Sequence, residues 1–224
     1  APIKLSIEDA VKNAMENNPL IKGAQLEIEK QQSLKKTAFD LDKTAITYTK
    51  GQLNGIQQDY NVNISQDFKF PTIYGTQAKL QADKIKLSET NLIVEKNKLE
   101  RNVRAIYLEL WFTKNKSNLI SSLEKEYENF ALIAEKKYAL GETNLIEKIA
   151  AEGKNEAIRL LKSEVELDIK SLTKQLQLLM NMDVSFEISN KNLEKIPFKT
   201  FTEENTENPI LLLQQNEMAI KERE

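Results

Sequence analysis

The dominant pattern in the chain is a seven-residue repeat of apolar positions within residues 76–140, a stretch that holds neither glycine nor proline. A repeat of seven is typical of α-helices that pack along a coiled-coil seam. It predicts a helix from Gln77 to Tyr138, about 62 residues long, which spans about 93 Å at 1.5 Å per residue. The repeat runs in three rows: Ile85, Leu92, Leu99 and Ile106; Leu80, Leu87 and Val94; Val103 and Leu110.

A second repeat of seven follows and predicts a helix from Leu145 to Asn181. The connection between the two helices is short, so they must pack antiparallel. Tyr107 and Trp111 on the first helix are expected to be packing residues rather than ligands. The seam of the second helix comprises Ile158, Val165, Leu172 and Leu179, with Leu161, Ile169 and Leu176 between them.

The two helices are separated by the stretch KKYALGETNLIEK. Its two lysines fall in the last turn of the first helix, where positive charge suits the helix dipole. Gly141 can adopt the left-handed conformation after the helix end, and Asn144 with Glu147 can form a capping box for the next helix. These residues predict a tight turn over residues 139–144 within a helical hairpin that covers residues 71–181.

The amino-terminal part predicts two shorter helices. Ser6 and Asp9 have the spacing of a capping box, which begins a short helix within residues 1–18. Asn18 and Pro19 then suit the cap and first position of a helix over residues 19–45. This helix and the one from Leu145 together match the length of the long helix, so we expect them to stack end to end against it. Residues 1–18 and 182–207 then form a belt midway along a rod.

The apolar period changes to two within residues 46–70, which predicts a β-hairpin. A single hairpin in a soluble protein is usually an ordinary sheet edge. Here the eleven residues of YNVNISQDFKF match a tilted membrane strand, and no neighbouring element supplies a core. The expected lipid-facing residues are Tyr60, Val62, Ile64, Phe68 and Phe70, and those of the opposite face are Asn61, Asn63, Ser65, Asp67 and Lys69.

Composition excludes several classes of function. The chain has 224 residues, a net charge of -2, no cysteine and no histidine. It therefore offers no thiolate or imidazole site for metals or catalysis, and no attraction to nucleic acid. Its carboxylates are scattered without a glycine-rich loop, a nucleophile elbow or metal-ligand spacing. We expect a non-enzymatic protein without a cofactor, and no apolar run approaches the roughly 18 residues of a membrane helix.

An internal repeat closes the sequence. The stretch ENPILLLQQNEMAIKE, which ends at Glu222, resembles NNPLIKGAQLEIEKQQ, which ends at Gln32. Both place Asn-Pro before an amphipathic continuation. We therefore expect residues 208–224 to begin a second copy of the unit, and the chain to be one repeat and the start of another from a longer protein.

The order of these features carries a family resemblance. LSIEDAVKNAMENNPLIKGAQLEIE, the strand NVNISQDFKFPTIYGTQ, the long helix, KKYALGETNLIEKIAAEGK and the recurring Asn-Pro together resemble the TolC-like outer membrane efflux family. The resemblance implies a mainly α fold of long antiparallel coiled-coil helices, of the α-barrel type, with a β-hairpin that contributes to a transmembrane β-barrel. FPTIYG and GETNLIEK are similar to the branch that serves heavy-metal efflux.

The resemblance also implies partners and a location. The protein would be a homotrimer in the outer membrane with most of this chain in the periplasm, working with a periplasmic adaptor and an inner-membrane pump of the resistance-nodulation-division type. Glu142 departs from the apolar residue that often follows the glycine in this family. The helical turn would be the periplasmic tip that meets the adaptor, and the matching residues are Leu140, Gly141, Glu142, Thr143, Asn144 and Glu147.

Two other classes of protein remain open. A periplasmic adaptor also carries a long helical hairpin, but no flanking strands of a small β domain surround this one. A structural coiled-coil protein without a channel leaves the strand hairpin and the internal repeat unexplained.

Overall fold

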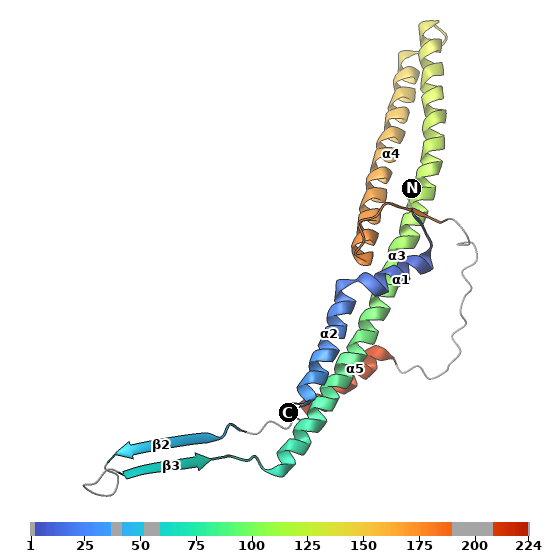
Figure 1. Cartoon of the computed structure of the whole chain (residues 1–224). Coiled ribbons are helices and arrows are strands. Elements are labelled where there is room, and N and C mark those ends of the chain that lie inside the picture. Colours follow the sequence, from blue (N-terminus) through green and yellow to red (C-terminus); the bar gives the residue numbers. More distant parts are fainter. Residues whose placement is uncertain (1–2, 37–41, 52–58, 190–207, 224) are drawn as a thin grey trace. The chain divides into compact units, whose positions relative to one another are not determined.

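A computed structural model describes residues 3–36, 42–51, 59–189 and 208–223 (Figure 1). The chain divides into two compact units. We call the first, Ala1–Ile21 with Lys96–Thr202, the helical-hairpin unit, and the second, Lys22–Glu95 with Glu203–Glu224, the strand unit. The predicted mainly α class with long packed helices and a small β-hairpin is confirmed. The elements are β1 (Ile3–Leu5), α1 (Ile7–Asn17), α2 (Pro19–Leu34), β2 (Ala45–Gly51), β3 (Asp59–Ser65), α3 (Pro71–Ala139), α4 (Leu145–Met180), β4 (Phe186–Ile188) and α5 (Pro209–Lys221).

The antiparallel packing of α3 and α4 forms the core of the helical-hairpin unit. Two ion pairs fix the register, because Lys162 Nζ lies 2.6 Å from Glu124 Oε2 and Arg159 lies 3.4 Å from Glu128. The predicted antiparallel seam is thus confirmed. Burying each aliphatic side chain of the seam contributes roughly 1.5–3 kcal/mol. The buried members are Val103, Tyr107, Leu110 and Ile120 on α3, and Ala151, Val165, Leu172, Leu176 and Met180 on α4.

A small parallel sheet joins the start of the chain to the segment after α4. Strands β1 and β4 pair with Leu5 opposite Ile188. The Leu5 carbonyl accepts the Ser189 amide at 2.9 Å and the Tyr107 hydroxyl, which donates at 2.8 Å. Tyr107 is only 1% exposed. One α3 side chain therefore ties this sheet to the helical core.

Two asparagines join the α1–α2 corner to the end of α4. Asn18 accepts the Leu20 amide at 2.9 Å, as predicted for a cap, and its side-chain amide also donates to the Leu179 carbonyl at 2.9 Å. Asn181 ends α4 in the left-handed conformation and donates to the Asn17 carbonyl at 3.4 Å. Because Asn18 is 4% exposed, both of its bonds are shielded from water.

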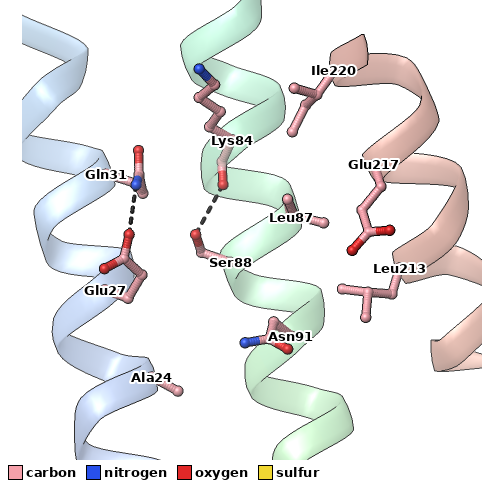
Figure 2. A pocket seen from close by; sticks show the side chains of 10 residues that line it. All are labelled: Ala24, Glu27, Gln31, Lys84, Leu87, Ser88, Asn91, Leu213, Glu217 and Ile220. Atoms are coloured by element: carbon pink, nitrogen blue, oxygen red, sulfur yellow. Dashed lines mark hydrogen bonds between the residues drawn. The ribbon is translucent and has the colours of Figure 1, made fainter.

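In the strand unit, α2 and α5 pack on the first part of α3. From α3, Gln81 donates to the Gln31 carbonyl of α2 at 2.7 Å. From α5, Asn216 donates to Thr90 at 3.0 Å, and Arg223 Nε forms an ion pair with Asp83 at 2.9 Å. Figure 2 shows α3 between its two neighbours. Two helices therefore cover this part of α3.

The internal repeat has a structural counterpart in the caps of α2 and α5. Both helices begin at a proline that follows an asparagine. Asn208 accepts the Ile210 amide at 3.0 Å, which matches the bond from Asn18 to the amide two residues on. Helix α5 thus begins at Pro209 with the same kind of cap as α2, and the prediction that residues 208–224 begin a second copy of the unit stays a prediction.

Three predicted boundaries are wrong. Helix α2 ends at Leu34 instead of near Ala45, and Ala45 itself is paired in the ladder with β3. With 16 and 36 residues, α2 and α4 also fall short of the 69 residues of α3, so two stacked helices do not match its length.

The other two boundaries lie where β3 gives way to α3. Strand β3 ends at Ser65 rather than Phe70, because β2 begins at the partner residue Ala45 and offers nothing for later residues to pair with. Helix α3 begins at Pro71 rather than Gln77, since proline suits the first position of a helix. The expected belt segment 182–207 contributes β4, and its residues 190–207 lie outside the described part of the chain.

Candidate functional site

The first candidate surface is the β2–β3 hairpin, whose register sorts its side chains onto two faces. Ile46 lies opposite Ile64 and Tyr48 opposite Val62, and directly opposed residues share a face. Tyr60 continues this apolar row. The polar row of the other face comprises Thr47, Thr49, Asn61 and Asn63.

The apolar face of the hairpin is uncovered. Each of its five large side chains is more than half exposed, in contrast to the nearly inaccessible residues of the α3–α4 seam. A continuous exposed apolar row marks a surface that meets a protein, a ligand or a membrane. The exposed fractions are 70% for Ile46, 62% for Tyr48, 77% for Tyr60, 56% for Val62 and 66% for Ile64.

The structure gives the hairpin an apolar face that differs at both ends from the set of residues predicted to face lipid, and lipid contact itself stays a prediction. It adds Ile46 and Tyr48, which sequence reasoning left out although both alternate with threonines along β2. It places Phe68 and Phe70 outside the strand, so the two phenylalanines do not extend the row of Tyr60, Val62 and Ile64. The expected eleven-residue strand is therefore a seven-residue one.

The second candidate surface is the turn between α3 and α4. Gly141 has a φ of 75°, the left-handed conformation expected for it. Its amide donates to the Tyr138 carbonyl at 3.0 Å, and the Glu142 amide donates to Lys137 at 2.9 Å. This pair of bonds is a Schellman motif, which satisfies the last carbonyls of α3.

At the start of α4, one of the two hydrogen bonds of the predicted capping box forms. The Glu147 amide donates to Asn144 Oδ1 at 2.9 Å. The Glu147 carboxylate accepts a bond from the Thr143 hydroxyl instead of reaching back to the Asn144 backbone. Lys148 lies 5.5 Å from the centre of the Tyr138 ring, a cation–π contact between the two helices. The turn is therefore held from both sides.

Exposed apolar side chains surround this turn. Leu140 is 74% exposed and Ile146 is 78% exposed, while Glu142 beside them is exposed and charged. Below them α3 and α4 enclose a groove of about 270 Å³. Both apolar and charged side chains line the groove. Its lining residues include Phe130, Ile133, Ala134, Lys137, Glu147 and Lys154.

A further groove, of about 480 Å³, lies in the strand unit among α2, α3 and α5 (Figure 2). On its α2 wall, Gln31 donates to Glu27 at 2.6 Å. This bond and a second one from Lys30 lower the pKa of the Glu27 carboxyl. Glu217 lies on the α5 wall. The groove combines apolar and ionised side chains without a nucleophile paired to a base.

Among the described helices, none combines the length and the apolarity that a bilayer crossing requires. Among the same described residues, no group of three or more acidic side chains is placed to hold a metal ion.

Comparison with known proteins gives matches at the level of structure. No protein-family model matches the chain, and no curated protein does. The chain is similar to CusC, with a TM-score of 0.77 and 14% identity over 97% of this chain and 54% of CusC. It is similar to the outer membrane channel CmeC of Campylobacter jejuni, with a TM-score of 0.75 and 15% identity over 97% of this chain and 51% of CmeC.

A membrane protein from Pseudomonas aeruginosa is similar as well, with a TM-score of 0.80 and 14% identity over 97% of this chain and 55% of that one. The chain thus spans about half the length of the solved structures that it matches. Over that half, it has the fold of TolC-like outer membrane channels.

Proposed function

We propose that this protein is a component of an outer membrane channel in a tripartite efflux system. The observation that carries the proposal is the β2–β3 hairpin, which exposes an apolar row on one face and a polar row on the other. The similarity in fold to the channel CmeC supports it. In this role the protein is not an enzyme: substrates pass through unchanged, and an inner-membrane pump supplies the energy.

The two faces of the hairpin suit a wall between lipid and water. Val62 and Ile64 would face the acyl chains, and Asn61 and Asn63 would face a water-filled interior. Each strand has one edge that the hairpin itself does not pair, and backbone groups in a bilayer must all be satisfied. Further strands must therefore close the sheet, which supports a homotrimer as the assembled form.

The turn between α3 and α4 is proposed as the site that meets a periplasmic adaptor. Leu140 and Glu142 are exposed there on a firmly capped backbone, which gives a partner a fixed surface. Charge reversal at Glu142 and Glu147 should reduce pump-dependent export while trimer assembly survives. Normal export in such variants, or export lost together with the trimer, would leave the turn as a helix connection only.

The experiment for the proposed function is recovery of the protein from cells that carry the full gene. We expect it in the outer-membrane fraction, as a trimer that dissociates on heating in detergent. An inner-membrane lipoprotein, followed in the same fractions, is the internal marker that controls the fractionation. Recovery as a soluble monomer or dimer would favour a periplasmic adaptor or a structural coiled coil instead.

We propose, more narrowly, that the exported substrates are heavy-metal ions. The support is the resemblance of FPTIYG and GETNLIEK to that branch of the family. Deleting the gene should sensitise cells to heavy-metal salts, and the sensitivity to organic dyes should stay unchanged. The reverse pattern would assign the channel to organic substrates.

A further inference from the structure

The α3–α4 hairpin divides into two parts by the way its seam is packed. We call residues 121–164, which surround the turn, the turn lobe. The structure describes every residue of this lobe, and only Ala151 and Asn155 among them are buried. We call residues 99–120 and 165–180 the base seam. Its buried side chains are mostly large and apolar: Leu99, Val103, Tyr107, Leu110, Thr113, Ile120, Val165, Leu172, Leu176 and Met180.

A row of polar residues runs along the α4 side of the turn lobe. Lys148, Asn155 and Lys162 recur every seven residues, so they share the stripe of α4 that faces α3. Lys148 lies 5.5 Å from the centre of the Tyr138 ring, and Lys162 forms its ion pair with Glu124 at 2.6 Å. The two ends of the row therefore each have a partner on α3.

Asn155, in the middle of this row, is a buried residue whose carbonyl has no partner. Its side chain is 8% exposed, and its Oδ1 is shielded from water and accepts no hydrogen bond. Steps of seven along α3 from Glu124 and from Tyr138 place Ala131 opposite it, and a methyl group cannot donate. A buried acceptor without a donor destabilises the closed seam relative to an open one, in which water supplies the donor.

The contacts that hold the turn lobe closed are mostly at its surface. Arg159 and Glu128 form an ion pair in which both side chains are about half exposed, and the pair of Lys162 with Glu124 is partly exposed. Exposed ion pairs contribute little to stability. Segments that bury few apolar groups open locally at a lower free energy than the rest of a protein. The turn lobe should therefore open more easily than the base seam.

We propose that the turn lobe opens and closes as a unit while the base seam stays packed, and that Asn155 sets how often it opens. Opening separates α3 from α4 between their turn and Ile120. The turn over residues 139–144 lies at the end of this lobe, so closure of the lobe fixes the surface that the turn presents. The inference requires neither a membrane nor a channel.

Hydrogen exchange of the full-length protein, followed by mass spectrometry of its peptides, measures this opening. After correction for intrinsic rates, peptides from both arms of the turn lobe, residues 121–138 and 145–164, should exchange at least about tenfold faster than peptides of the base seam. The two arms should also show a common protection factor, because both helices lose their packing in one event.

Two substitutions should shift the opening in opposite directions. Asn155→Leu removes the unpaired carbonyl and adds apolar surface against Ala131, so exchange in both arms should slow by about tenfold. Lys162→Met leaves the Glu124 carboxylate without its partner, so exchange in both arms should become about threefold faster. Exchange in the base seam should stay unchanged in both variants.

Matched controls are Asn129→Leu and Lys170→Met, which make the same replacements at exposed positions of the two helices and should change neither part. Equal protection of the turn lobe and the base seam in the unmodified protein overturns the proposal. So does a response to Asn155→Leu that is confined to amides within one turn of that residue, or one that slows the base seam equally. None of these outcomes bears on the outer-membrane location, which the fractionation experiment tests separately.

Discussion

Replacing Tyr107 with phenylalanine removes one hydroxyl and leaves the buried ring in place. The hydroxyl donates to the Leu5 carbonyl at 2.8 Å. Loss of the hydroxyl leaves no buried hydrogen-bond donor without a partner, and the Leu5 carbonyl keeps its bond from the Ser189 amide. The substitution should therefore lower the free energy of unfolding of the purified chain by about 1 kcal/mol near pH 8.

The difference in stability between wild type and Tyr107→Phe should also depend on pH. Burial, with the Glu8 carboxylate as the second cause, raises the pKa of Tyr107 from 10.0 to about 12. The unfolded chain releases the phenolic proton near pH 10, whereas the folded chain holds it until about pH 12. The contribution of Tyr107 to the free energy of unfolding is therefore complete below pH 10 and is lost as the pH rises through 12. At pH 12 the loss amounts to about 2 kcal/mol.

Urea unfolding at pH 8, 11 and 12 measures this difference. Wild type should be the more stable protein at pH 8, nearly equal to Tyr107→Phe around pH 11 and the less stable one at pH 12. Because the two proteins differ at Tyr107 alone, the difference between them removes the contributions of all other groups. A difference in stability that stays constant from pH 8 to pH 12 would refute the buried hydrogen-bonded position of Tyr107.

Three further experiments test other parts of the account. Arg at Ile64 should cost about 2–4 kcal/mol in membrane-inserted protein, and Arg at Asn63 far less, which refolding into lipid vesicles measures; equal costs would contradict the two-faced hairpin. Gly141→Val should destabilise the turn by about 1–2 kcal/mol through its left-handed backbone, as thermal unfolding would show, whereas an unchanged stability would mean that the turn relaxes freely. Asn18→Ala should cost about 2–3 kcal/mol in urea because it removes a cap and the bond to α4, and Asn208→Ala about 1 kcal/mol because it removes a cap only; identical losses would discount the bond to α4.

Local chemistry explains which parts of the fold the sequence could predict. The capping box of Ser6 and Asp9 forms as expected, since both partners lie within one helical turn. Gly141 adopts its left-handed conformation as expected, since glycine has no Cβ that would oppose a positive φ. The seam of α3 and α4 follows from a repeat long enough to exclude other pairings.

The elements that the sequence did not predict depend on distant partners. Strands β1 and β4 have three residues each and lie far apart in the chain, so no local pattern distinguishes them from loop. The end of β3 is set by where β2 begins, at Ala45. Alternation could sort the residues of the apolar face only up to Ser65, because beyond this residue β3 has no pairing partner on β2.

The most direct test of the central claim is a scan of single cysteines along the hairpin, in a chain whose 224 residues include no cysteine. Each cysteine carries a nitroxide label, and spin relaxation by oxygen and by a water-soluble nickel complex is compared in reconstituted liposomes. The account predicts that labels at Tyr60, Val62 and Ile64 favour oxygen, and that labels at Asn61 and Asn63 favour the nickel complex. Equal access of the nickel complex to all five positions would contradict a membrane-spanning hairpin.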